Sequence, residues 1–287
     1  MLKRELNFSG PSPILYLVAT PIGNREEFST RAIKTLQEVD FIGCEDTRNS
    51  GQLFASFNID KPLISCHEHN EEEAANKIVA LLKEGKKVAY VSDAGYPTIS
   101  DPGGRLVKRA LEEGIKVSVI NGPSASVCAL AASGLDTSHY YFEGFLPSKP
   151  SERDSELKEL SVRKETIVFY ESPHRIDKTL KAMKEILGED RNAVIARELT
   201  KLHEEFIRGS LGELASIDAS TLIGEMVIVV EGAKSLQKSL SEEEIVSQLL
   251  TLLKSMKPKD AIATLAENNK INKNKVYSLY LEKIKEK

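Results

Sequence analysis

The stretch Ile14-Leu15-Tyr16-Leu17-Val18-Ala19-Thr20-Pro21-Ile22-Gly23-Asn24 decides the fold class of this chain. Its first six residues form a continuous apolar run, which is typical of a parallel strand buried on both faces of a sheet. The run stops at a turn whose threonine, proline and glycine favour loop conformations. The sequence therefore predicts a central strand that carries a special turn to one edge of a sheet.

Similar short apolar runs recur along the chain, and up to about residue 122 they alternate with amphipathic helical patterns. This alternation predicts an α/β fold with an open, mostly parallel sheet and helices on its faces. A second α/β unit is expected to begin near Ser124. The predicted strands are 14–19, 39–44, 63–66, 88–92 and 117–120 in the first unit and 140–142, 166–170, 193–196 and 226–230 in the second, with a hairpin arm at 203–209.

Two helix starts are predicted from local signals. Asp101 is expected to cap the helix that follows it, with Pro102 in the first turn and Gly114 at the end. Ser172 is expected to cap a second helix, with Pro173 as its first residue.

A chain of 287 residues is long enough for about two domains. The predicted limits are 12–123 and 124–234 for two α/β domains and 241–287 for a small helical extension. From Lys254 onward there are nine lysines and four acidic residues, so this segment carries +5 while the whole chain carries −4. Its short helices with basic ends suggest a helix-turn-helix-like module that holds a phosphate backbone, although a packing appendage or a dimer arm is slightly favoured over it.

The composition excludes several classes of protein. Three widely spaced cysteines, Cys44, Cys66 and Cys128, argue against a disulfide framework and favour a reducing cytoplasm. No apolar run approaches the ~20 residues of a membrane-spanning helix, and residues 1–12 lack the pattern of a signal peptide. The glycine motifs of dinucleotide-binding and P-loop proteins are also absent from the sequence.

Four turns rich in Gly, Pro, Asp and Ser follow predicted strands, at 19–24, 44–48, 92–104 and 121–126. Ligands of open α/β sheets bind beyond the carboxyl ends of the strands, so these turns are expected to build one cleft. In the loop 92–104, glycines allow close backbone approach and two prolines stiffen the chain. Its main-chain groups are therefore expected to contact an adenosine or amino-acid moiety, whereas Asp93 and Asp101 taken singly are more typical of turn and cap residues.

Together these segments resemble the ribosomal RNA small subunit methyltransferase I family, whose fold is similar to that of the tetrapyrrole methylases. The resemblance covers about residues 12–235 and is carried by 17–24, 45–48, 91–103, 122–125, 171–175 and 196–201. It implies two α/β domains of tetrapyrrole-methylase type with S-adenosyl-L-methionine (SAM) between them, and a homodimer. It also implies SAM-dependent 2′-O-methylation of a cytidine ribose in the decoding region of 16S rRNA, in the 30S ribosomal subunit, with neither a membrane nor DNA as partner.

The resemblance further implies the residues that contact the cofactor. They come from the special turns and from two strand ends of the second domain: Pro21, Asp93, Ala94, Gly95, Thr98, Ile99, Gly122, Ser124, Ala125, Tyr170, Arg197, Leu199, Thr200, Glu225 and Met226.

Methyl transfer from a sulfonium is an in-line displacement that mainly requires alignment of the reacting atoms. A ribose hydroxyl is a poor nucleophile at neutral pH, so a general base is expected to help. Glu45 or Asp46 is the hypothesised base, with Arg48 placing an RNA phosphate and Lys201 as a second candidate for phosphate contact or hydroxyl activation. The alternative is that Glu45, Asp46 and Arg48 form an ion-pair turn on the surface.

Other interpretations stay open at this point. The segment Cys66-His67-Glu68-His69 suggests a metal site, but no further Cys/His cluster completes a tetrahedral set, so no metal is predicted. Tetrapyrrole methylases carry a glycine-rich turn where this chain has Ala19-Thr20-Pro21-Ile22-Gly23, which argues against a small-molecule methyltransferase of that type. Besides an RNA methyltransferase and a small-molecule methyltransferase, the remaining alternative is a non-catalytic ribosome-binding factor that keeps the fold for recognition.

Overall fold

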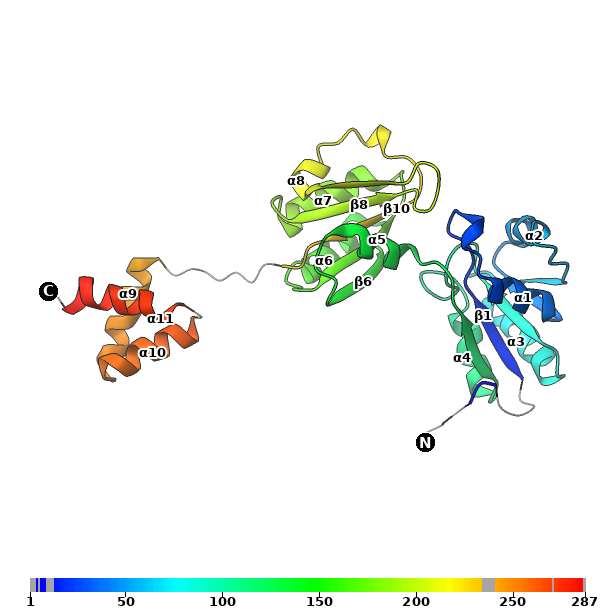
Figure 1. The fold of residues 1–287 in the computed structure, drawn as a ribbon, viewed down its shortest axis with the longest axis horizontal. Coiled ribbons are helices and arrows are strands. Elements are labelled where there is room, and N and C mark those ends of the chain that lie inside the picture. The colour runs from blue at the N-terminus through cyan, green and yellow to red at the C-terminus, as the bar shows by residue number, and fades with distance from the viewer. Residues whose placement is uncertain (1–3, 5, 9–12, 234–240, 270, 286–287) are drawn as a thin grey trace. The chain divides into compact units, whose positions relative to one another are not determined.

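The computed structural model describes residues 4, 6–8, 13–233, 241–269 and 271–285. The chain divides into two compact units, residues 1–232 and residues 233–287. In the described part of the chain, unit 1 contains two five-stranded sheets with helices packed on them, and unit 2 contains helices (Figure 1).

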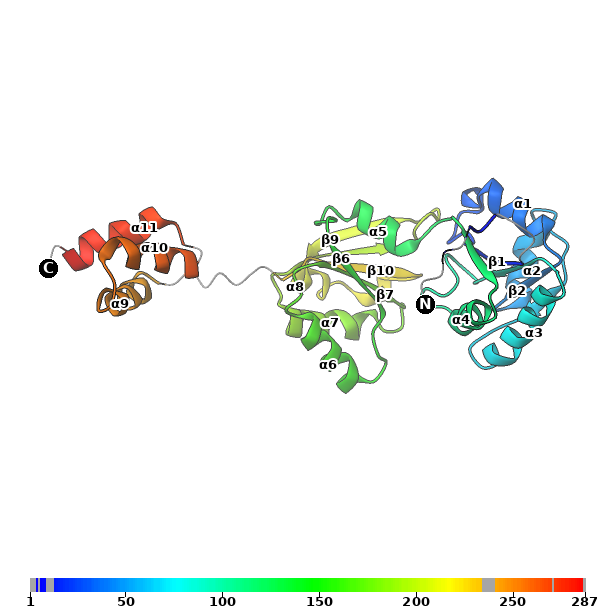
Figure 2. The same ribbon diagram turned by 90° about the horizontal axis from the view of Figure 1, so that it is seen from below.

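The first sheet is parallel, in the order β3-β2-β4-β1-β5. Its strands are β1 (Ile14–Val18), β2 (Phe41–Cys44), β3 (Leu63–Ser65), β4 (Val88–Val91) and β5 (Lys116–Ile120), so all five predicted strands are confirmed. Figure 2 shows helices on both faces of this sheet. The helices are α1 (Thr30–Glu38), α2 (Thr47–Ala55), α3 (Glu71–Lys83) and α4 (Gly104–Glu112), with a short 3-10 turn η1 (Arg25–Glu27) before α1.

The position of β1 explains its continuous apolar run. Leu15 and Leu17 pack with α3 and α4, whereas Tyr16 and Val18 pack with α1 and α2. Both faces of the strand are therefore covered, which requires apolar side chains at successive positions.

The second sheet is mixed, in the order β6-β7-β10-β8-β9. Its strands are β6 (Tyr140–Phe145), β7 (Thr166–Glu171), β8 (Asn192–Arg197), β9 (Glu205–Ser210) and β10 (Met226–Val230), of which only the β6–β7 pair is parallel among the described pairs. β9 is the predicted hairpin arm, and its pairing with β8 confirms that prediction. α6 (Pro150–Leu160), α7 (Ile176–Leu187) and α8 (Leu211–Leu214) cover one face, and α5 (Ala125–Ser133) covers the other.

The predicted start of α4 is wrong. The helix begins at Gly104 with Gly103 as its N-cap, and Gly103 has a φ of 118°. The buried carboxylate of Glu71 in α3 accepts hydrogen bonds from the N–H groups of Gly103 (3.0 Å) and Arg105 (2.7 Å). Glu71, which is distant in the sequence, therefore caps the helix in place of Asp101. Asp101 lies outside the helix. The predicted end is confirmed, because Gly114 follows the helix with a φ of 73°.

The predicted start of α7 is also wrong. The helix begins at Ile176, and Ser172 and Pro173 belong to the turn before it. The carbonyl of Ser172 accepts the N–H groups of Arg175 and Ile176, both at 3.1 Å, without capping by its side chain. Arg175 fixes this turn, because its guanidinium donates to the carbonyl oxygen of Leu146 at 2.7 Å.

Unit 2 has its own core. Its helices α9 (Glu242–Leu253), α10 (Pro258–Asn268) and α11 (Lys273–Tyr280), and the final turn η3 (Leu281–Lys285), enclose Ile245, Leu249, Ile262, Leu265 and Val276. The prediction of short helices in this segment is therefore confirmed.

The predicted domain limits at 123, 124 and 241 stay predictions, and those at residues 12, 234 and 287 lie outside the described residues. Within the described ranges, no helix is long and apolar enough to cross a bilayer.

Candidate functional site

A cavity of about 290 Å³ opens in unit 1 between loops of the two sheets. Its size is close to the lower end of the roughly 300–1,000 Å³ typical of small-molecule sites. Nine of the residues named for the cofactor line it: Ala94, Gly95, Ile99, Ser124, Ala125, Tyr170, Leu199, Glu225 and Met226. The structure thus brings together segments that are far apart in the sequence.

Nine other residues also line the cavity: Ile22, Tyr96, Ser100, Asp101, Phe145, Glu171, Ser172, Pro173 and Val227. Ile22 and Tyr96 lie inside turns that the sequence did single out. Asp101, Ser172 and Pro173 were predicted to lie at helix starts. The sequence did mark the positions of Asp101, Ser172 and Pro173, because they belong to the turn 92–104 and the segment 171–175, whereas Phe145 carries no such signal.

The wall from the first sheet is built by the turn after β1 and the loop after β4. Thr20 and Gly95 form an isolated bridge, with N–H to carbonyl distances of 2.9 and 3.0 Å. The loop also uses main-chain groups internally, since the N–H of Thr98 donates to the carbonyl of Pro102. Its backbone is therefore less open to a ligand than the sequence suggested.

Backbone strain occurs on both walls. Thr98 and Ser100 have φ values of 77° and 60°, and Glu198 and Thr200 have values of 51° and 66°. Non-glycine residues in this region cost of order 1–3 kcal/mol each and persist where the surroundings hold them, often at ligand sites. The strain is a signal for the site that the sequence does not show.

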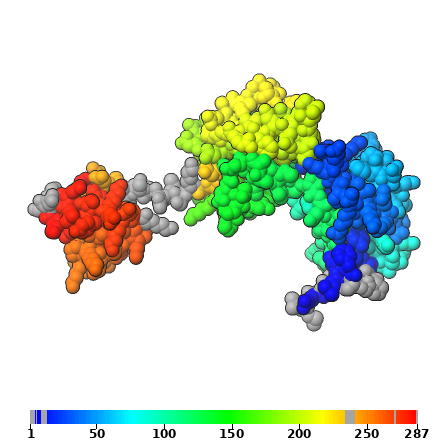
Figure 3. Space-filling model, viewed as in Figure 1, coloured from blue at the N-terminus to red at the C-terminus, as the bar shows by residue number. Residues whose placement is uncertain are grey.

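The two walls are joined by direct contacts. The side-chain oxygen of Thr200 accepts the N–H of Asn24 at 3.0 Å. A Cβ atom on Gly23 would lie 2.6 Å from Cγ of Lys201 and 3.0 Å from the carbonyl oxygen of Leu199, so glycine permits this close approach. Figure 3 shows the blue and yellow-green parts of unit 1 in contact.

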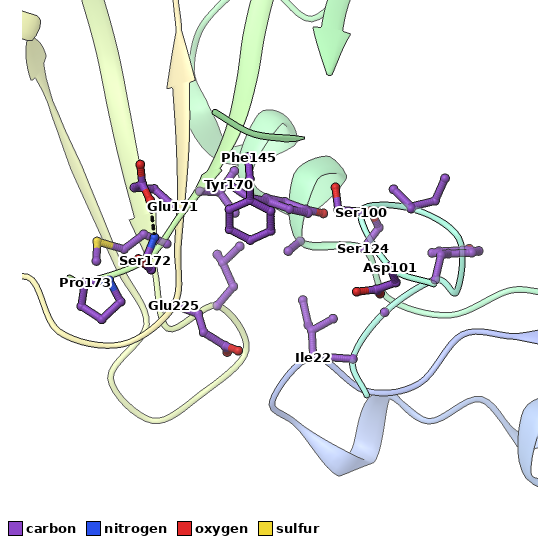
Figure 4. Close-up of a pocket in the computed structure, with 18 residues that line it drawn as sticks. Ile22, Ser100, Asp101, Ser124, Phe145, Tyr170, Glu171, Ser172, Pro173 and Glu225 are labelled. Carbon is purple, nitrogen blue, oxygen red and sulfur yellow. Dashed lines mark hydrogen bonds between the residues drawn. The ribbon is translucent and has the colours of Figure 1, made fainter. Parts of the chain in front are cut away.

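Aromatic side chains form part of the wall from the second sheet. The ring of Tyr170 lies edge-on to Phe145 and Phe142, with centroid distances of 5.5 and 5.1 Å. Phe145 is 54% exposed although it is a large apolar residue, and it faces the cavity (Figure 4). Such a surface suits the flat ring of a base.

The charged groups of the lining are all carboxylates. They belong to Asp101, Glu171 and Glu225, and the described lining contains no Lys, Arg or His. Glu171 is buried and already bonded to the N–H of Ser172 (2.8 Å) and the hydroxyl of Thr179 (2.5 Å). The carboxylates of Asp101 and Glu225 point toward the cavity from opposite walls (Figure 4). The cavity therefore suits a ligand with a cationic group and disfavours a polyphosphate.

Asp101 has an unusual acidity. Burial raises its pKa from 3.8 to about 6, and the negative charges of Glu45 and Asp93 add to the increase while the Ser92 hydroxyl opposes it. Perturbed acidity inside a cleft is typical of functional groups.

The other proposed catalytic residues lie outside the cavity lining. The carboxylate of Asp46 caps α2, accepting the N–H of Arg48 at 2.7 Å, and it pairs with the guanidinium of Arg48 at 3.4 Å. These hydrogen bonds lower the pKa of Asp46. For Asp46 and Arg48, the structure shows the ion-pair turn that was the alternative interpretation. Glu45 is half-buried beside them, and burial followed by the charge of Asp93 raises its pKa.

Lys201 holds a lining residue in place. Its ammonium donates to Glu198 at 2.9 Å and to Glu225 at 2.8 Å. Burial lowers the pKa of Lys201, but hydrogen bonds to Glu225 and Glu198 outweigh it and the net shift is upward. The two hydrogen bonds therefore favour the protonated form of Lys201, and its catalytic role stays a prediction.

The remaining residues named for the cofactor lie beside the cavity lining: Pro21, Asp93, Thr98, Gly122, Arg197 and Thr200. Asp93 accepts a hydrogen bond from the amide of Asn49 at 2.9 Å, and the N–H of Gly122 donates to the hydroxyl of Tyr96 at 3.3 Å. These contacts support the lining residues. No group of three potential metal ligands occurs in the described ranges, and the rings of His67 and His69 lie 6.0 Å apart.

The architecture is similar to that of known proteins. The family model for tetrapyrrole (corrin/porphyrin) methylases matches residues 14–215. Uroporphyrin-III-C-methyltransferase from Thermus thermophilus is similar in structure, with a TM-score of 0.55 and 19% identity over 76% of this chain and 94% of that one. Cobalt precorrin-4 methyltransferase gives a TM-score of 0.58 and 20% identity over the same shares of the two chains. At these identities the likeness concerns the fold, and it confirms two α/β domains of tetrapyrrole-methylase type.

Sequence relatives are much more similar. Ribosomal RNA small subunit methyltransferase I of Bacillus subtilis (strain 168) is 44% identical, over 98% of this chain and 99% of that protein. The proteins of the same name from Vibrio cholerae and Escherichia coli O157:H7 are each 42% identical, over 96% and 93% of this chain and 96% and 94% of theirs. With the two sheets, the cavity between them and these relatives in agreement, this chain belongs to the ribosomal RNA small subunit methyltransferase I family, within the tetrapyrrole methylases.

Proposed function

We propose that this protein transfers a methyl group from SAM to the ribose 2′-hydroxyl of a cytidine in the decoding region of 16S rRNA. The relatives named above support a ribosomal RNA substrate. The single observation that carries the cofactor assignment is the apolar cavity whose charged lining groups are all carboxylates.

The lining offers partners for each part of SAM. When bound, SAM supplies a methyl group activated by a positively charged sulfur. The Glu225 carboxylate suits a cationic group of SAM, and the rings of Phe145 and Tyr170 suit its adenine. Ser124 is the N-cap of α5, makes no side-chain cap bond, and lines the cavity. The positive end of that helix therefore faces the cavity and suits the carboxylate of SAM.

The residues of this chain align the reacting atoms and exclude water from them. The hydrogen bond from Asn24 to Thr200 and the close approach at Gly23 join the two walls, which favours one geometry. A fixed geometry converts the transfer into an effectively intramolecular step, which is the main requirement of an in-line displacement.

The substrate class is tested by incubating the protein with tritiated SAM and, separately, 30S subunits, free 16S RNA and a tetrapyrrole precursor. We expect label in the RNA of the first or second reaction and none in the tetrapyrrole. Ribose-methylation mapping of RNA from cells with and without the gene then identifies the nucleotide. Label in the tetrapyrrole alone would replace the proposed substrate by a small molecule.

Cofactor binding is tested by calorimetry with SAM, using ATP as the matched control because it shares adenosine but carries phosphates. We expect SAM to bind and ATP to show no competition. A folded protein that binds no SAM would support the non-catalytic ribosome-binding factor instead. A homodimer remains a prediction, which sedimentation equilibrium checks directly.

A further inference from the structure

We propose that Asp101 accepts the proton of the attacking ribose hydroxyl, an inference that rests on the proposed methyl transfer. Asp101 lies in the loop between β4 and α4, and its carboxylate is directed into the cavity (Figure 4). The sequence assigned it the role of a helix cap, which would occupy its oxygen atoms.

In the structure, Asp101 does not cap α4. Glu71 accepts the hydrogen bonds at the start of α4, so the Asp101 carboxylate is not needed there. In the described part of the chain, no Lys, Arg or His forms an ion pair with Asp101. A proton acceptor must have an oxygen atom open to the substrate, and Asp101 meets this requirement.

The neighbouring carboxylates are less available as proton acceptors. Glu171 is buried and bonded to Ser172 and Thr179. Glu225 is held by the ammonium of Lys201 at 2.8 Å, and Asp46 caps α2 outside the cavity. Glu45 is not among the lining residues. Asp101 is thus the lining carboxylate with the fewest competing partners.

The acidity of Asp101 fits this task. Its pKa of about 6 follows from burial and from the facing charges of Glu45 and Asp93, with the Ser92 hydroxyl acting in the opposite direction. The Tyr170 phenol also faces it, and burial keeps that group neutral by raising its pKa. A base whose pKa lies near the working pH is mostly ionised and still takes up a proton readily.

The step balances in atoms and charge. The hydroxyl proton moves to a carboxylate oxygen of Asp101 while the ribose oxygen forms its bond to the methyl carbon. The bond from that carbon to sulfur breaks, and its electron pair stays on sulfur. Asp101 then releases the proton to water, which restores the carboxylate for the next turnover.

The test compares Asp101→Asn with Asp101→Glu and with the matched control Asp60→Asn, an exposed carboxyl outside the cavity. We expect Asp101→Asn to lower the single-turnover rate on RNA by about 10²- to 10⁴-fold, the usual range for loss of a general base. Its Kd for SAM by calorimetry should stay within about threefold, because Glu225 and the aromatic wall remain. Asp101→Glu should recover part of the rate, and Asp60→Asn should match the wild type in both measurements.

A readout that needs no turnover is the carboxyl titration of Asp101 in the SAM-free protein, followed by carbon-13 NMR and assigned by its loss in Asp101→Asn. We expect a midpoint near 6. A midpoint at the ordinary value near 4 would overturn the proposal.

The remaining outcomes distinguish a failure of the role proposed for Asp101 from a failure of the proposed function. A wild type that methylates RNA together with a fully active Asp101→Asn overturns the role of Asp101 and leaves the proposed function standing. A normal rate at saturating SAM combined with a Kd raised more than tenfold makes Asp101 a cofactor contact instead. A wild type that binds SAM but labels no RNA overturns the proposed function, and this inference with it.

Discussion

The Asp101 carboxylate destabilises the folded chain when it is ionised. Its pKa rises from 3.8 to about 6 on folding, so the native state binds more protons than the unfolded state between these values. Stability must therefore fall as pH rises through this window.

This linkage predicts that Asp101→Asn is more stable than the wild type at pH 8, by about 1 kcal/mol after allowance for solvent screening. The gain should vanish at pH 4, where the wild-type carboxyl is largely protonated. Urea denaturation of both proteins at the two pH values checks this. An equal difference at pH 4 and pH 8 would contradict the assigned acidity.

Gly23 is a second residue whose role is open to test. A Cβ atom there would meet Lys201, Thr200 and the Leu199 carbonyl at 2.6 to 3.0 Å. Overpacking of this kind costs about 1–3 kcal/mol, so Gly23→Ala should weaken SAM binding roughly 5- to 100-fold in calorimetry. Gly104→Ala is the control, because its added Cβ has no neighbour within 4 Å. Equal affinities in the two variants would show that the wall contact does not shape the cavity.

At the scale of helices and strands, the turn before α7 depends on Arg175. Its guanidinium donates to the carbonyl of Leu146 (2.7 Å) and to the hydroxyl of Ser148 (3.2 Å), and it lies 3.5 Å from the buried carboxylate of Glu171. One side chain thus connects the end of β7, the loop after β6 and the start of α7.

Arg175→Ala should therefore destabilise unit 1 by about 2–4 kcal/mol, because it removes the cation beside the buried Glu171 carboxylate and the donor to the Leu146 carbonyl. Lys178→Ala, at an exposed position of the same helix, should change stability by less than about 0.5 kcal/mol. Chemical denaturation measures both. Similar losses in the two variants would assign the effect to the helix rather than to the arginine.

The strands were predictable from the sequence because their signal is local. Apolar runs such as 14–18 and 226–230 record burial on both faces, and the structure has a strand at each of these runs. The starts of α4 and α7 were not predictable, because their hydrogen-bond partners come from residues distant in the chain, such as Glu71 and Leu146. Ala94 and Gly95 belong to a glycine turn that the sequence shows, whereas Phe145 reaches the cavity only because β6 lies beside β7.

At the scale of the whole molecule, the two units have separate cores. Buried residues of unit 2, such as Ile245 and Leu265, cluster with each other. The cavity is lined by residues of unit 1 alone. The role of the basic extension, in RNA binding or as a dimer arm, stays a prediction.

A fragment that ends at Gly232 should therefore fold and bind SAM with a Kd within about threefold of the full chain. Thermal unfolding of the full chain should show two transitions, of which the fragment retains one. Calorimetry and circular dichroism on both proteins check these points. A fragment that is unfolded, or that loses SAM binding, would show that unit 2 stabilises unit 1.

The apolar lining has a consequence for the reaction as a whole. Side chains such as Phe145, Tyr170 and Met226 keep the local dielectric constant low, where separated charges are unfavourable. A step that begins with a cationic sulfur and an ionised Asp101, and ends with a thioether and a protonated acid, cancels one charge of each sign. The apolar wall thus favours the products of this charge cancellation over its reactants.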